Sequence, residues 1–264
     1  MSRWNALLAL TAIPMLSAAQ APAEIVKPIQ PSKIILVGDS TTAVWGGWGP
    51  SFCAYHVSSF LACLNLARGG RSSGSYRAEG SWTVAVNEMR VAGYQNVWVL
   101  IQFGHNDQPG KPGRSTDLRT EFPANIRRYV EEARAAGAKP VLVTPLTRRS
   151  FKDGKLDNDL ALWAEAIRKV AADMQVPLLD LNAESAAAVQ AMGSTEADRL
   201  AELPENADVA PPPGTTEVND RPLGPPKQAF DHTHLGVSGA NYFATMVTLE
   251  LWRSVPELRH FLLQ

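Results

Sequence analysis

Short, almost wholly apolar runs alternate with longer stretches of helical periodicity along most of the chain. The runs are rich in β-branched residues, which is typical of strands that are buried on both faces of a sheet. They occupy residues 34–37, 63–66, 97–102, 140–144 and 176–181. The helical stretches occupy residues 81–92, 120–136, 158–173, 183–192 and 239–253. The pattern therefore predicts an α/β protein.

Strands in regular alternation with helices favour a five-stranded parallel sheet between two helical layers, an α/β/α sandwich. Gly93 and Gly137 stand where two of the helices are expected to end. If the strand order is 2-1-3-4-5, the loops after the first three strands are neighbours at the carboxyl edge of the sheet. No internal repeat or second domain is needed, so we expect one domain over residues 24–264.

A proline-rich stretch at residues 204–226 interrupts the pattern. Helix and central strand are both excluded there, because proline lacks the backbone N–H that both structures use. Two interpretations stay open, a surface loop and a wall over a ligand site. The second arises because the stretch leads directly into Phe-Asp-His-Thr-His at residues 230–234.

Composition narrows the class of protein further. Of the 264 residues, 45% are hydrophobic and 19% are charged, which excludes a disordered chain. A net charge of −1 provides no general attraction for nucleic acid, so we expect no nucleic-acid partner. Two cysteines are too few for a disulfide framework or a four-cysteine zinc site.

The N-terminus has the order of a secretory signal peptide. Arg3 supplies a positive charge, residues 6–16 are mainly apolar, and small residues follow. We expect a signal peptide over residues 1–23, cleaved after Ala19 or Ala23. The apolar run is shorter than the roughly 20 residues that span a bilayer, so we expect no membrane anchor. The protein is then secreted or periplasmic.

Export bears on the two cysteines, Cys53 and Cys63. In an oxidising compartment they can form a disulfide, and their separation permits it. Two separate buried thiols remain the alternative.

For the oligomeric state of the protein, we expect a monomer.

Unusual polar and glycine-rich sequences follow the first three predicted strands. Ser40 lies just past the first strand, where a serine suits either a nucleophile or a helix cap. Gly69 and Gly70 follow the second strand, and paired glycines suit either a backbone oxyanion donor or a plain turn. Asn106 follows the third strand, as an oxyanion donor or a turn residue.

Asp231, His232 and His234 lie together near the C-terminus. An imidazole and a carboxylate on one loop can act as general base and orienting acid for a serine. A metal-binding or merely polar loop is the alternative. Taken in order, the four segments supply a nucleophile, a base, an acid and oxyanion donors, which is the full set for acyl transfer.

The ordered motifs resemble those of the SGNH (GDSL-type) hydrolase superfamily, and within it the rhamnogalacturonan acetylesterase-like carbohydrate esterases. They are Gly-Asp-Ser-Thr at residues 38–41, Gly-Gly-Arg-Ser-Ser at 69–73, Gly-His-Asn-Asp at 104–107 and Asp-His-Thr-His at 231–234. The resemblance spans residues 33–253, and the ordered set is more specific than any one motif.

This resemblance implies a flavodoxin-like fold and assigns the roles at the site. It makes Ser40 the nucleophile, His234 the base and Asp231 the acid that orients it. The oxyanion hole consists of the N–H groups of Ser40 and Gly70 and the side chain of Asn106. No cofactor or metal is implied, and the remaining histidine of the last motif takes no part in proton transfer.

The function expected is hydrolysis of O-acetyl esters on a cell-wall polysaccharide, with rhamnogalacturonan (pectin) favoured. Among substrate contacts, Arg71 suits a uronate carboxylate, with a salt-bridged rim as the alternative. Tyr76 and Trp82 suit stacking on sugar rings, as do Trp45 and Trp48, with core packing as the alternative for all four.

Two further functions are weighed against this one. One is an esterase that acts on another acetylated glycan or on a small acyl ester, which the sequence barely distinguishes. The other is a metal-dependent phosphoesterase that would use Asp39, Asp107 and the two C-terminal histidines. Such enzymes tend to carry Gly-Asn-His, whereas this chain has Gly-His-Asn.

Overall fold

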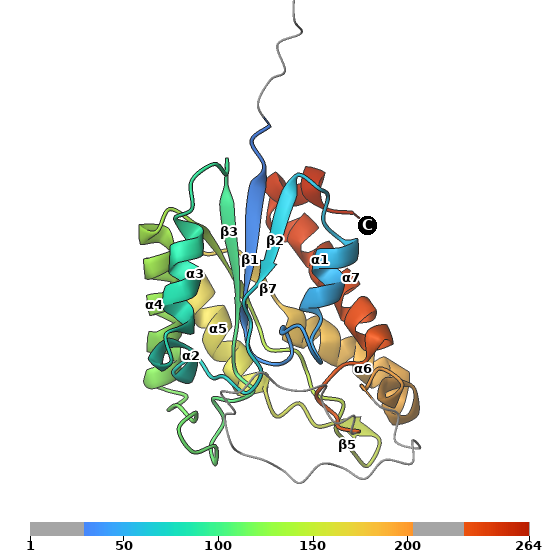
Figure 1. The fold of residues 1–264 in the computed structure, drawn as a ribbon. Helices are drawn as coiled ribbons and strands as arrows, with labels where there is room; N and C mark the ends of the chain where they lie inside the picture. The colour runs from blue at the N-terminus through green and yellow to red at the C-terminus, as the bar shows by residue number, and fades with distance from the viewer. Residues whose placement is uncertain (1–28, 203–229, 264) are drawn as a thin grey trace, which may run out of the picture.

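The computed structural model describes residues 29–202 and 230–263. Five parallel strands form one sheet in the order β2-β1-β3-β4-β7, as the sequence predicted (Figure 1). The strands are β1 (Ser32–Gly38), β2 (Leu61–Asn65), β3 (Val97–Gln102), β4 (Lys139–Val143) and β7 (Leu178–Leu179). The expected α/β/α sandwich is confirmed.

Helices cover both faces of the sheet (Figure 1). On one face lie α2 (Ser75–Ala78), α3 (Ser81–Met89), α4 (Glu121–Ala135) and α5 (Ala161–Met174). On the other lie α1 (Gly49–Tyr55), α6 (Leu181–Asp198) and α7 (Val237–Ser254), which the 3-10 helix η1 (Pro256–Phe261) follows. A short hairpin, β5 (Phe151–Lys152) and β6 (Lys155–Leu156), stands apart from the sheet.

The core explains why the strands read as continuous apolar runs. Successive side chains of a strand point to opposite faces, so Ile34 and Leu36 of β1 pack into one cluster while Ile35 and Val37 pack into the other. All four are fully buried. A strand that is covered by helices on both sides has no solvent-exposed face, so apolar residues occupy both of its faces.

The structure differs from the predicted elements at the edges. The last strand keeps only two of the six predicted residues, because it pairs with β4 alone and α6 begins at Leu181. The helix predicted to end at residue 192 continues as α6, with a break at Gly193, whose φ is 75°. The short elements α1, α2, β5, β6 and η1 were not predicted.

Cys53 and Cys63 form a disulfide between α1 and β2, with their Cα atoms 5.4 Å apart. This decides between the two alternatives that the sequence left open.

The C-terminal segment is held at the amino end of the sheet. Leu263 N–H donates to the carbonyl of His56 (2.9 Å), and Ser58 N–H donates to the carbonyl of Phe261 (2.8 Å).

The predicted signal peptide (residues 1–23) and the proline-rich stretch (204–226) lie outside the described residues. Within the described part of the chain, none of the helices combines the length and the apolar character needed to span a bilayer.

Candidate active site

The loops after β1 and β2 meet at the predicted nucleophile. Ser40 lies half-buried two residues beyond the end of β1. The N–H of Arg68 donates to the carbonyl of Gly38 (3.0 Å), which ties the second loop to the first. A Cβ placed on Gly69 would lie 3.7 Å from the Cβ of Ser40. The glycine pair therefore lies directly beside the serine, as the strand order predicts.

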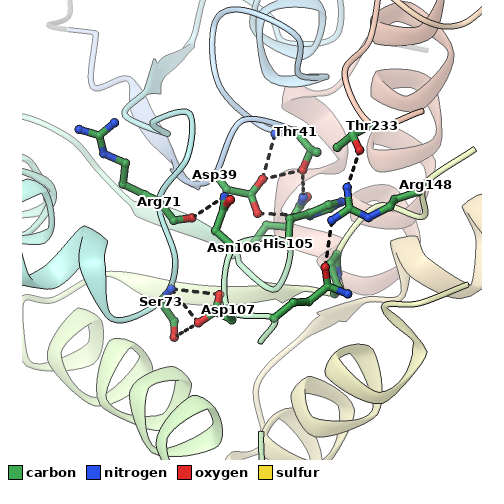
Figure 2. A network of polar contacts seen from close by, with 12 residues as sticks. Asp39, Thr41, Arg71, Ser73, His105, Asn106, Asp107, Arg148 and Thr233 are labelled. Atoms are coloured by element: carbon green, nitrogen blue, oxygen red, sulfur yellow. Dashed lines mark hydrogen bonds and ion pairs between the residues drawn. The ribbon is translucent and has the colours of Figure 1, made fainter. Parts of the chain in front are cut away.

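The loop after β3 is tied to the loop after β2 through Asp107 (Figure 2). Its buried carboxylate accepts hydrogen bonds from Ser73 Oγ (2.6 Å), Ser73 N (3.0 Å) and Thr116 Oγ1 (3.0 Å). Burial raises the pKa of Asp107 to about 6, although the bonds from Ser73 and Thr116 oppose the shift. This carboxylate joins two loops and does not face a substrate.

Arg114 connects the two residues predicted to complete the oxyanion hole. Its Nη1 donates to the carbonyl of Gly70 (3.3 Å) and to Oδ1 of Asn106 (3.4 Å). Gly70 has a φ of 78°, in the left-handed region that glycine enters without strain. The Asn106 amide donates one N–H to the carbonyl of Arg71 (3.1 Å), and its nitrogen carries a second N–H. Arg114 was not among the site residues predicted from the sequence.

Asp39, which precedes Ser40 in the chain, forms a buried pair with His105 (Figure 2). Oδ1 of Asp39 accepts bonds from Thr41 N (2.9 Å) and Thr41 Oγ1 (2.8 Å), and Nδ1 of His105 lies 3.3 Å from Oδ2. Burial lowers the pKa of His105, so its imidazole is neutral at neutral pH. His105 therefore contacts the first loop through the carboxylate of Asp39.

His234 and Asp231 contact each other directly. The distance from His234 Nδ1 to Asp231 Oδ2 is 2.5 Å, and the other carboxylate oxygen accepts the N–H groups of Thr233 (2.7 Å) and His234 (2.5 Å). Burial favours the neutral imidazole, but the bond and charge of Asp231 outweigh it and raise the pKa of His234. Although burial opposes ionisation, His234 and these N–H groups lower the pKa of Asp231.

The ring of His234 contacts the turn that follows Ser40. Leu235 N–H donates to the carbonyl of Gly46 (2.9 Å). A Cβ on Gly46 would lie 3.0 Å from Cδ2 of His234, so the backbone of the turn contacts the imidazole ring. Gly46 has a φ of 72°. The predicted base and nucleophile thus come from neighbouring loops.

A buried arginine, Arg149, bonds to the backbone of the loop that carries Asp231 and His234, which is called the dyad loop below. Nη2 of Arg149 donates to the carbonyls of Asp231 (2.9 Å) and His234 (2.7 Å), and its backbone N–H donates to the carbonyl of His232 (2.8 Å). Burial lowers the pKa of Arg149 to about 10, at which the guanidinium still carries its charge at neutral pH. The sequence offers only a basic residue in the segment after an apolar strand, which does not identify these carbonyl partners.

Two of the predicted substrate contacts are corrected by burial. Tyr76 is 0% exposed and its hydroxyl donates to the carbonyl of Leu66 (2.8 Å), while Trp82 is 4% exposed and packs edge-on against Tyr129. Neither ring has a face left for a sugar, because α2 and α3 turn both into the core.

The other predicted substrate contacts differ in how exposed they are and in their partners. Trp48 is buried and bonds to Gln102, whereas Trp45 is 65% exposed. Arg71, the expected uronate contact, pairs with Glu79 at 2.8 Å and also donates to the carbonyl of Gly69 (2.9 Å). Trp45 is thus the aromatic residue among the predicted contacts that presents its ring to solvent.

The groups of the metal-dependent alternative do not converge. The carboxylates of Asp39 and Asp107 are both buried in contacts with protein groups, on different loops. His232 turns instead toward Asp198, with Nδ1 3.6 Å from its carboxylate. The arrangement does not favour a metal-dependent phosphoesterase.

The fold and this arrangement of loops are those of a serine hydrolase. Residues 36–240 match the GDSL-like Lipase/Acylhydrolase family, and the chain belongs to that family. A rhamnogalacturonan acetylesterase of Bacillus subtilis is 35% identical over 182 residues, which cover 66% of this chain and 74% of that protein. A second B. subtilis protein, named "Probable rhamnogalacturonan acetylesterase", is 34% identical over 161 residues, covering 58% and 72%.

The solved structures agree in fold. A crystal structure of another B. subtilis protein superposes with a TM-score of 0.64 at 22% identity, covering 86% of this chain and 58% of that one.

Proposed function

We propose that this protein is a serine esterase that releases acetate from O-acetyl esters of rhamnogalacturonan. The observation that carries the proposal is the contact between Gly46, on the turn that follows Ser40, and the ring of His234, which Asp231 orients. The two relatives, both named as rhamnogalacturonan acetylesterases, support the substrate class.

The tautomer of His234 follows from its partner. Because Asp231 is ionised, Nδ1 of the ring carries the proton that it donates to the carboxylate, and Nε2 keeps its lone pair. In the first step Nε2 accepts the proton of the Ser40 hydroxyl as Oγ attacks the acetyl carbonyl carbon. The carbonyl π electrons move to oxygen and form a tetrahedral oxyanion.

We assign three donors to that oxyanion. They are the N–H of Ser40, the N–H of Gly70 and the second N–H of the Asn106 amide. When the intermediate collapses, the bond to the sugar oxygen breaks and His234 returns the proton to that oxygen. Water then attacks the acetyl-enzyme by the same route, which releases acetate and restores the serine hydroxyl.

We also propose that the chain is exported. The disulfide between Cys53 and Cys63 supports this, because disulfides persist in oxidising compartments and are rare in the cytosol. Expression of the full chain followed by N-terminal sequencing of the exported protein tests it. A mature N-terminus after Ala19 or Ala23 is expected, and retention of Met1 in a cell-associated product contradicts it.

The esterase is tested by acetate release from acetylated rhamnogalacturonan and xylan oligosaccharides. The wild type is compared with Ser40→Ala, His234→Ala and His232→Ala. We expect the first two variants to lose almost all turnover, and His232→Ala to retain it, because this ring faces Asp198. Full activity of Ser40→Ala would contradict a serine mechanism, and loss in His232→Ala alone would reverse the base assignment.

A further inference from the structure

Three cationic side chains converge on the loop after β3, which carries the oxyanion amide. Lys111 Nζ donates to the carbonyl of His105 (2.6 Å). Arg114 Nη1 donates to Oδ1 of Asn106 (3.4 Å), and Arg148 Nη2 donates to Oε1 of Gln108 (3.0 Å). Each cation thus contacts an uncharged oxygen of the same four-residue segment, 105–108.

The cluster reaches the dyad loop as well. Arg148 extends from the chain after β4 and donates to Oγ1 of Thr233, the residue between the two histidines (Figure 2). Its Nε contacts the carboxylate of Asp159 at 3.1 Å. Arg148 therefore links the loop that carries the oxyanion amide to the loop that carries the base.

Lys111 lies within the electrostatic reach of both arginines. Burial and the positive charges of Arg148 and Arg114 lower the pKa of its ammonium, and the carboxylates of Asp39 and Asp159 oppose the shift. An anion that enters beside Lys111 would relieve this repulsion. The ammonium has three N–H donors, and the carbonyl of His105 uses one.

We propose that Lys111, together with Arg148 and Arg114, binds the carboxylate of a uronic acid unit of the substrate. This proposal rests on the proposed function, since it assigns a role to the anionic sugar of the polymer. A carboxylate is the ligand that suits the cluster, because cationic N–H groups bind anionic oxygens roughly twice as strongly as neutral ones do. The carboxylate would anchor the sugar chain with an acetyl ester beside Ser40.

The subsite would also explain how a protein with no net positive charge attracts an anionic polymer. The chain carries a net charge of −1, so the molecule as a whole does not attract an anionic polysaccharide. Attraction must come from a local group of cations. Placed beside the oxyanion amide, the cluster draws the uronate to the position where the chemistry takes place.

Binding of deacetylated rhamnogalacturonan oligosaccharides, measured by calorimetry, tests the subsite without any catalytic step. Each protein receives the same oligosaccharides in two forms, with free carboxylates and with methyl-esterified carboxylates. For the wild type we expect tighter binding of the free carboxylates. In Lys111→Gln, the affinity ratio of the two forms should fall about tenfold, which is the effect of one charge-assisted bond.

The matched control is Lys139→Gln. Lys139 begins β4, at the edge of the sheet opposite the catalytic loops, and its side chain is about half exposed. Its ratio should equal that of the wild type. An unchanged ratio in Lys111→Gln, or an equal fall in Lys139→Gln, would overturn the subsite. Failure of the wild type to release acetate would contradict the esterase instead, whatever the binding ratio.

Discussion

The guanidinium of Arg149 donates a 2.7 Å hydrogen bond to the carbonyl oxygen of His234, the proposed catalytic base. The same Nη2 atom donates to the carbonyl of Asp231. A buried cation in the segment between β4 and β5 therefore bonds to the backbone of both members of the dyad, more than eighty residues later in the chain. His234 is thus fixed both through its backbone carbonyl and through its carboxylate partner.

Arg149→Lys should lower kcat by about ten- to a hundredfold with little change in KM. Lysine keeps the charge but cannot reach both carbonyls, so the dyad loop loses its fixed position, and small misplacements of catalytic groups are costly. Steady-state kinetics with acetylated oligosaccharides measures this. Arg149→Met, which leaves buried carbonyls without a donor, should also lower the unfolding free energy by about 3 kcal/mol or more.

Arg128→Lys is the matched control, because Arg128 lies exposed on α4 and its ion pair with Glu132 is superficial. It should keep the wild-type kcat and stability. A wild-type kcat in Arg149→Lys would show that the loop holds its position without the arginine.

The pH dependence should report the dyad. His234 acts as a base only when neutral, so kcat/KM falls as the pH drops below its pKa, which Asp231 raises above the ordinary histidine value of about 6.5. Asp231→Asn removes the negative charge, so the acid limb of the profile should move to lower pH. The maximal rate should fall by about 10³- to 10⁴-fold, because the tautomer is no longer fixed. An acid limb that stays in place would assign it to another group.

Asn106→Ala should reduce kcat by about 10²- to 10³-fold, which is the usual cost of losing one oxyanion donor. Its stability should change less, since the amide makes one bond to the Arg71 carbonyl and accepts a long one from Arg114. Rate and thermal stability are measured on the same preparation. A large loss of stability with a small loss of kcat would make Asn106 a structural residue.

Trp45→Ala should raise KM for acetylated oligosaccharides by about three- to tenfold. The ring is 65% exposed on the turn whose Gly46 contacts His234, and an aromatic contact is worth about 0.5–1.5 kcal/mol beyond its buried area. Trp45→Phe should restore most of the affinity. Trp252→Ala, which removes a 40% exposed tryptophan from α7, is the control and should leave KM unchanged.

Replacing Cys53 and Cys63 together with alanine should lower the unfolding free energy by about 2.5–3 kcal/mol. The disulfide closes a short loop, with a separation of ten residues, and loop closure of that length restricts the unfolded chain by about this amount. Urea unfolding measures it. Dithiothreitol should lower the midpoint of the wild type and leave that of the double variant unchanged.

A strand that is buried between two neighbouring strands is the element best predicted from the sequence. Residues 97–102 were predicted as a strand and form β3 with the same bounds, and all six residues are buried. The edge strand β7 was overestimated, since apolar residues that follow a strand can equally begin a helix, as Leu181 does. Apolar character does not distinguish these two environments.

For the site, the sequence predicted which loops come together but not the role of every residue on them. The order of motifs predicted which loops come together, because topology alone brings them to one edge of the sheet. The roles of Tyr76 and Trp82 depend on which way two short helices turn, and a tryptophan looks the same in a core as on a binding surface. Arg149 could not be assigned, because its partners are backbone carbonyls, which leave no trace in the identity of the residues that carry them.

The anchoring of the last residues at the amino end of the sheet has a practical consequence. Val57 and Leu262 form an antiparallel bridge there, and the Leu263 N–H bonds to the carbonyl of His56. Leu263, the last described residue, therefore lies on the side opposite the catalytic loops (Figure 1). A tether to a solid support, or a fused carbohydrate-binding module, attached at this end would leave the esterase facing its polymer.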